Sequence, residues 1–166
     1  MAFLVRKIIR GKWESTWSSI EPEDIPADLI TGGELRTKSN TLSVWRIDSI
    51  AEFDNAVLAI ASGYQSVSGV DVVAIDETEL QEVGLRIQPR PSPTPMTCMG
   101  DAHYNVCGLA AGTLPKFAAC VVRSISQGSV ASYPVDAVGS LLRSALSDRL
   151  VVRSRMQKSL LGELQL

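Results

Sequence analysis

The stretch 41–61 changes its hydrophobic period from about two residues to about four, and this change constrains the fold more than any other feature. The apolar strand positions are Leu42, Val44 and Ile47, and the apolar helix positions are Phe53, Val57, Ile60 and Ala61. Asp48 or Ser49 can cap the helix, and Gly63 can end it. Because a strand followed by its own helix needs further elements to bury its apolar faces, this unit predicts an α/β domain.

Several segments around this unit predict the remaining elements of such a domain. Strands are expected over 2–10, 69–76 and 85–88, and short helices near 24–31 and 76–83. We therefore predict that residues 1–88 form an α/β (α+β-like) domain. Its sheet is expected to be small and mixed, with about three to four strands.

A proline-rich segment predicts the boundary of this domain. Four of the seven residues from Pro89 to Pro95 are proline, which excludes a helix interior and favours an extended conformation. Beyond it, apolar residues recur at helical spacing, most clearly from Val138 to Leu146. Helices are expected over 101–111 and 116–125, after Pro134, and over 152–164. We predict a connection over 89–96 and a helical C-terminal region over 97–166.

The charge is divided between the two halves of the chain. Residues 1–88 hold 8 Lys and Arg against 14 Asp and Glu, whereas residues 89–166 hold 8 Lys and Arg against 4 Asp and Glu. Near the C-terminus the cations form a cluster, Arg149, Arg153, Arg155 and Lys158, with Arg143 nearby. This cluster predicts an interface with a protein partner. The alternative is contact with nucleic acid phosphates.

Two tryptophans are further candidates for an interface. Trp13 and Trp17 lie four residues apart in a polar segment, which would place both on one side of a helix. Tryptophan is enriched at the energetic centres of protein interfaces. We therefore add both residues to the predicted interface.

The strand ending at Asp76 and Glu77 resembles the magnesium-binding strand of nucleotide hydrolases in pattern only. Four apolar residues precede the two acids. The chemistry also needs a glycine-rich phosphate loop, but the nearest match, 32–39, has Thr37 where the glycine before the lysine should stand. A buried strand that ends in an acidic helix cap is therefore the favoured interpretation. A small enzyme with carboxylates at a strand end is kept as an alternative.

The cysteines and the single histidine carry weak chemical signals. Cys98, His103 and Cys107 are close in sequence, but the paired cysteines of a zinc knuckle are absent, and Cys120 lies among apolar residues. Asp101 and His103 are the remaining candidates for catalysis, and no nucleophile motif accompanies them. We predict no metal and no cofactor. The odd number of cysteines and the lack of a secretory leader favour reduced thiols in the cytoplasm.

These patterns predict a binding protein rather than an enzyme. The leading hypothesis is a non-catalytic intracellular interaction module, such as an accessory or immunity-type subunit that docks on a larger protein complex. A nucleic-acid-associated factor that uses the basic C-terminal helices is the second hypothesis. No stretch of eighteen apolar residues is present, so we expect no membrane contact.

Overall fold

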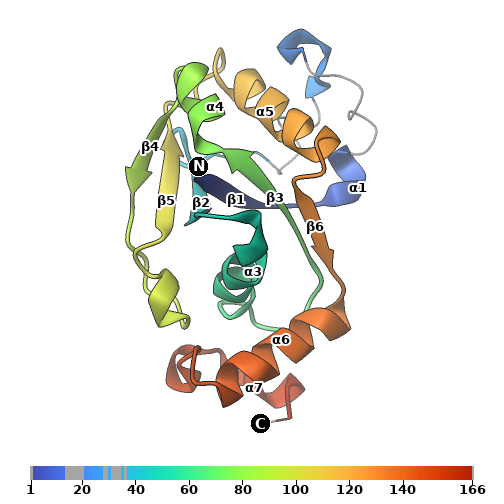
Figure 1. Ribbon diagram of the computed structural model, residues 1–166, viewed down its shortest axis with the longest axis vertical. Coiled ribbons are helices and arrows are strands. Elements are labelled where there is room, and N and C mark those ends of the chain that lie inside the picture. The colour runs from blue at the N-terminus through green and yellow to red at the C-terminus, as the bar shows by residue number, and fades with distance from the viewer. Residues whose placement is uncertain (1, 14–20, 28–29, 31–34, 36, 166) are drawn as a thin grey trace.

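The computed structural model describes residues 2–13, 21–27, 30, 35 and 37–165. They form a mixed α/β fold around one six-stranded sheet, in which all pairings are antiparallel and the strand order is β4-β5-β2-β1-β3-β6 (Figure 1). The strands are β1 Phe3–Ile8, β2 Thr41–Ile47, β3 Val70–Asp76, β4 Arg86–Pro89, β5 His103–Cys107 and β6 Val130–Tyr133.

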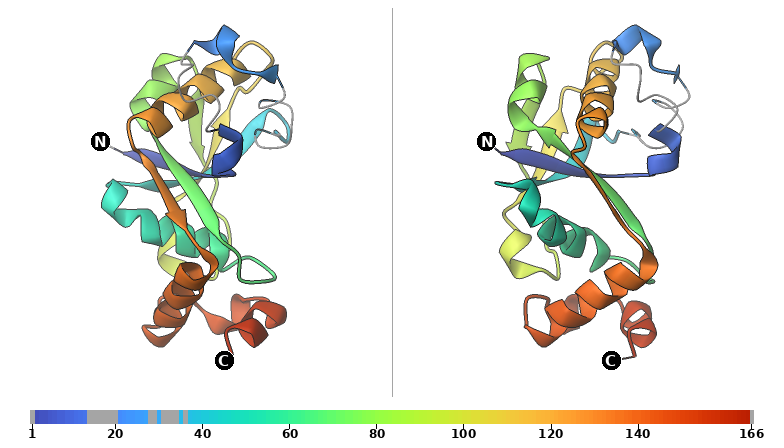
Figure 2. Two further views of the ribbon diagram at one scale, coloured as in Figure 1. Left: turned by 90° about the vertical axis from the view of Figure 1, so that its right-hand side faces the viewer. Right: turned by 45° about the vertical axis from the view of Figure 1, so that its right-hand side comes forward.

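Helices cover both faces of the sheet (Figure 2). The α-helices are α1 Arg10–Trp13, α3 Phe53–Ala61, α4 Glu77–Glu82, α5 Leu114–Ser126, α6 Val135–Ser147 and α7 Lys158–Glu163. Short 3-10 turns are η2 Pro22–Asp24, η3 Ile50–Glu52, η4 Thr97–Met99 and η5 Arg153–Arg155. One core lies between the sheet and α5, and the other lies between the sheet and the group of α3, α6 and α7. Within the described residues, no helix combines the length and apolar character that crossing a membrane requires.

The predicted α/β class is confirmed, but the predicted sheet of three to four strands is too small. The two additional strands, β5 and β6, come from the region predicted to be helical. Residues on both sides of the proline-rich connection therefore share one sheet.

The helix predicted over 101–111 is wrong, because residues 103–107 form strand β5. Val106 belongs to the core under α5, whereas its neighbour Asn105 faces the opposite side of the sheet. Gly108 follows with a φ of 84°, a conformation that glycine adopts without a steric penalty. The strand is so short that its alternation is difficult to separate from a helical pattern in the sequence alone.

Strand β3 has the burial expected of a strand covered on two faces. Val72, Val73 and Ile75 have no exposed surface, and alternate residues contribute to the two cores. The strand lies between β1 and the short edge strand β6, one position from the edge of the sheet. It is therefore interior but not central.

The C-terminal segment is fastened to earlier parts of the chain by polar contacts. The backbone N–H of Val152 donates to the carbonyl of Pro95 at 2.8 Å, so the end of the proline-rich connection packs against the segment after α6. On α7, the Ser159 hydroxyl donates to the carbonyl of Gln65 at 2.6 Å, and the Glu163 carboxylate accepts from the N–H of Val67 at 2.7 Å. The predicted helix over 152–164 is correspondingly shorter, since only Lys158–Glu163 is α-helical.

Replacing Val73 with aspartate should abolish folding. The side chain has no exposed surface, and the substitution would bury a charge without a partner while losing about 1.5–3 kcal/mol of apolar burial. We expect no soluble protein with a native circular dichroism spectrum. Ser66→Asp adds the same charge at an exposed position and should fold normally. A well-folded Val73→Asp variant would contradict the two-sided burial of β3.

Candidate functional site

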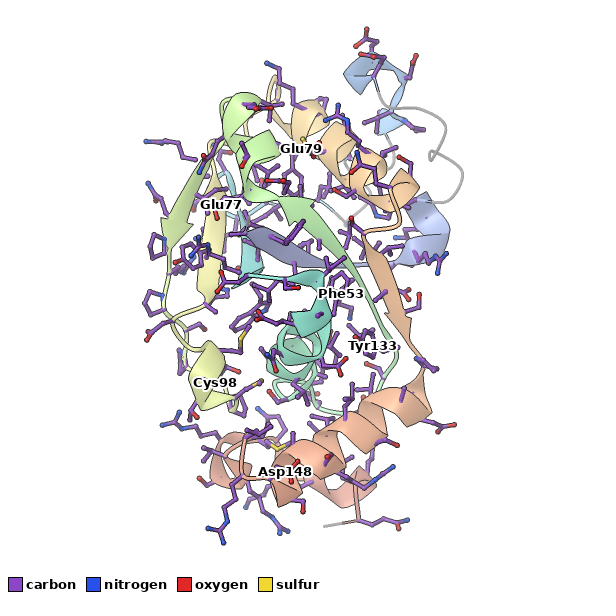
Figure 3. The ribbon with its side chains drawn as sticks, viewed as in Figure 1. Phe53, Glu77, Glu79, Cys98, Tyr133 and Asp148 are labelled. Atoms are coloured by element: carbon purple, nitrogen blue, oxygen red, sulfur yellow. The ribbon has the colours of Figure 1, made fainter. Side chains whose placement is uncertain are left out.

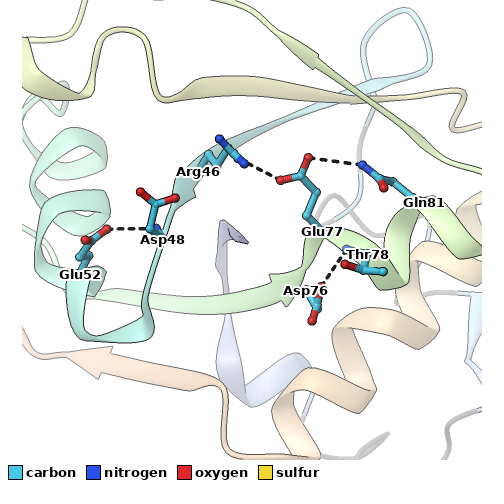
Figure 4. Close-up of polar contacts among 7 residues, drawn as sticks. All are labelled: Arg46, Asp48, Glu52, Asp76, Glu77, Thr78 and Gln81. Atoms are coloured by element: carbon cyan, nitrogen blue, oxygen red, sulfur yellow. Dashed lines mark hydrogen bonds and ion pairs between the residues drawn. The ribbon is translucent and has the colours of Figure 1, made fainter. Parts of the chain in front are cut away.

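The two acids at the end of β3 have structural partners (Figure 4). Asp76 caps α4, because its Oδ1 accepts from the N–H of Thr78 at 2.8 Å. Glu77 forms an ion pair with Arg46 of β2 at 2.9 Å and accepts from the Gln81 amide at 3.4 Å. The hydrogen bond that Arg46 donates to Glu77 raises the pKa of the Arg46 guanidinium. The two carboxylates thus fasten α4 to the sheet, as the helix-cap interpretation predicts.

The candidate metal ligands are dispersed. Cys98 lies exposed in η4, Cys107 is buried on β5, and Cys120 is buried on α5 in the core on the other face of the sheet. Figure 3 shows Cys98 away from the labelled acids Glu77 and Glu79. Among the residues that the structure describes, no three His, Cys, Asp or Glu side chains gather as a metal site would require.

His103, like Asp76 and Glu77, is fixed by specific contacts. Its Nδ1 lies 2.6 Å from the carbonyl of Arg90, and its ring meets the Trp45 indole edge-on with centroids 4.8 Å apart. Because a carbonyl can only accept, Nδ1 carries a proton and donates it. Asp101 is exposed two residues earlier, in the turn before β5.

Neither of the two tryptophans lies on the part of the surface that the structure describes. Trp13 ends α1 and has no exposed surface, since it packs in the core that α5 covers. We therefore assign it to the core and leave it out of the interface developed below. Trp17 lies outside the described residues.

The end of α6 brings part of the basic cluster together. The helix closes with two backbone hydrogen bonds, from the Arg149 N–H to the Leu146 carbonyl at 3.2 Å and from the Leu150 N–H to the Ala145 carbonyl at 2.8 Å. These bonds form a Schellman motif, in which the residue after the cap adopts a left-handed conformation and is usually glycine. Here that residue is Arg149, with a φ of 59°. A left-handed conformation costs a residue with a side chain roughly 1–2 kcal/mol.

Around this helix end the surface is hollowed by about 520 Å³. Arg143, Arg149 and Arg153 line the hollow, and Leu146 and Val151 supply apolar lining. Val151 is held in place by a β-bridge to Met96. We call this feature the arginine hollow. The charge density of the sequence identified its arginines, and the end of α6 brings Leu146 and Val151 into the same lining.

The carboxylates nearby do not line the arginine hollow. Asp148, labelled at the end of α6 in Figure 3, accepts from the Ser144 hydroxyl at 3.3 Å. Arg155 and Lys158 are exposed but also lie outside the lining. Arg143 lines the hollow but also a neighbouring pocket with Asp136 and Glu163, and its guanidinium lies against Gly139 of α6. The hollow thus combines arginine side chains with apolar ones, an arrangement suited to an acidic ligand that also carries an apolar group.

The buried thiol on α5 should make folding sensitive to alkaline pH. Burial, with a smaller contribution from the Glu79 charge, raises the pKa of Cys120 from 9.0 to about 11. Above pH 9 the unfolded chain therefore loses this proton first. The free energy of unfolding should fall between pH 9 and 11 by up to about 1.4 kcal/mol per pH unit.

Denaturant unfolding across this pH range tests the effect. The Cys120→Ala variant should lose less stability between pH 9 and 11 than the wild type, and Cys98→Ala should follow the wild type because Cys98 is exposed. Parallel profiles for wild type and Cys120→Ala would contradict the assignment.

Compared with protein-family models, curated proteins and solved structures, the chain matches none of them.

Proposed function

We propose that this protein is a non-catalytic interaction module that binds an acidic segment of a protein partner in the arginine hollow. The observation that carries the proposal is the conformation of Arg149, which takes a left-handed position that glycine would occupy at lower cost. Strained residues of this kind cluster at binding sites and other functional sites. At this position the retained side chain is a guanidinium that lines the hollow.

The lining favours a protein segment over a nucleic acid. Guanidinium groups bind carboxylates and phosphates alike, so charge alone does not distinguish the two partners. Leu146 and Val151 contribute apolar lining, and Leu150, next to Val151 in sequence, is 45% exposed. An acidic peptide with an apolar side chain satisfies both features, because the apolar group can be buried while carboxylates meet the rim. Among the described residues that line the hollow none is aromatic, so the hollow offers no platform for stacking bases.

Charge reversal tests the role of the cations. The triple variant Arg149→Glu, Arg153→Glu, Arg155→Glu should bind a synthetic peptide of glutamates around one leucine at least tenfold more weakly than the wild type, measured by fluorescence anisotropy. A tenfold loss corresponds to about 1.4 kcal/mol. The matched control reverses Lys12, Arg86 and Lys116, which are equally exposed on other elements, and should retain binding.

The triple variant and its control also distinguish a protein partner from a nucleic acid. In a second experiment each protein is titrated with duplex DNA instead of the peptide, over a range of salt concentrations. If only the wild type and control bind DNA tightly and with strong salt dependence, while the peptide binds none of the proteins, the nucleic-acid hypothesis replaces the interaction module.

A single substitution separates the function of Arg149 from its structural role. Arg149→Gly should leave the free energy of unfolding within about 1 kcal/mol of wild type, because relief of the left-handed strain offsets the greater freedom of glycine in the unfolded chain. Peptide affinity should nevertheless fall severalfold. Chemical denaturation and anisotropy on the same samples measure both quantities. Unchanged affinity in this variant would remove the main support for the proposal.

A further inference from the structure

An exposed acidic segment lies far from the arginine hollow, at the turn η2. Glu21 precedes this turn, Glu23 and Asp24 belong to it, and all three side chains are exposed. We call residues 21–26 the acidic turn. It packs against α5, whereas the arginine hollow lies at the end of α6. The blue turn beside α5 and the helix α6 lie at opposite ends of the long axis (Figure 1), and the views in Figure 2 agree.

The acidic turn is anchored to the core by Ile25. This side chain is 6% exposed and belongs to the core that α5 covers. The Asp24 N–H donates to the Glu21 carbonyl at 3.1 Å, which closes the backbone between the first and the last acid. A segment that is already fixed in this way loses less conformational entropy on binding than a flexible one does.

The side chains of the acidic turn match the ligand class inferred for the arginine hollow. Within the described residues, none of its three carboxylates forms an ion pair. Pro26 is exposed next to them and supplies an apolar ring. Guanidinium groups pair with carboxylates, and the apolar lining of the hollow, Leu146 and Val151, suits such a ring. The hollow measures about 520 Å³, which is large enough for several side chains.

The charge division of the whole chain favours the same contact. Residues 1–88 carry a net charge of 8 − 14 = −6, and residues 89–166 carry 8 − 4 = +4. Because the acidic turn and the hollow lie at opposite ends of one molecule, they can meet only between two molecules. Such a contact is heterologous, since one copy contributes the turn and the other contributes the hollow.

We propose that the acidic turn of one copy of this protein binds in the arginine hollow of a second copy. The inference rests on the proposed function, because it names a second copy as a partner that brings the acidic segment. Opposite charges steer this head-to-tail association, so it strengthens as the salt concentration falls.

Sedimentation equilibrium at increasing protein concentration tests the proposal. In about 0.05 M sodium chloride the mean mass of the wild type should rise above the 17.9 kDa of one chain, and about 0.5 M should reverse the rise. One variant replaces Glu21, Glu23 and Asp24 with lysine, and the other is the triple arginine reversal described above. Each alone should raise the dissociation constant at least about tenfold.

An equimolar mixture of these two variants is the decisive sample. One variant keeps an intact hollow and the other keeps an intact acidic turn, so the mixture should associate again. The matched control replaces Asp48, Glu82 and Asp101 with lysine, which changes the net charge equally at other exposed positions. It should associate like the wild type.

Peptide binding separates this inference from the proposed function. If the wild type binds the peptide of glutamates around one leucine but keeps the mass of one chain at every concentration, association between copies is refuted and the proposed function stands. The inference also fails if either reversal variant alone associates like the wild type, or if their mixture does not associate. If peptide binding is absent as well, both proposals fall together.

Discussion

The antiparallel ladder between β1 and β3 is the interaction on which the rest of the fold depends. It is the longest continuous pairing described, running from Phe3↔Asp76 to Ile8↔Asp71. Both faces of this ladder are apolar, so each must be covered, and α5 covers one while α3 and α6 cover the other. The covering helices are also linked to the sheet by side chains. The Tyr133 hydroxyl of β6, for example, donates to Asp54 of α3 at 2.6 Å.

The same ladder sets where the sheet opens. Because β1 follows β3 beyond Val5, no described strand covers residues 41–44 of β2 on that side, and a cavity of about 410 Å³ lies there. The arginine hollow arises differently, from the way α6 ends. Both hollows therefore occur where regular hydrogen bonding stops, next to turns with positive φ at Ser39 and Asn40 or at Arg149.

Local patterns in the sequence predicted local structure well and long-range pairing poorly. The strand and helix of 41–61 are confirmed as β2 and α3, and the predicted 116–125 helix lies within α5. Local patterns did not predict β5 and β6, because short strands owe their conformation to partners far away in the sequence. For the sites, charge density identified Arg149 and Arg153. His103 stood alone in the sequence, and only the pairing of β5 with β2 brings it near Arg6 and Lys38.

The two edge strands bear on how this protein avoids aggregation. β4 and β6 are each four residues long, β4 ends in Pro89, and Pro134 directly follows β6. Short edges that are interrupted by proline offer few free backbone groups to a strand from another chain. Growth of the sheet by edge-to-edge addition is therefore disfavoured, which directs association with other molecules to side-chain surfaces rather than to the backbone.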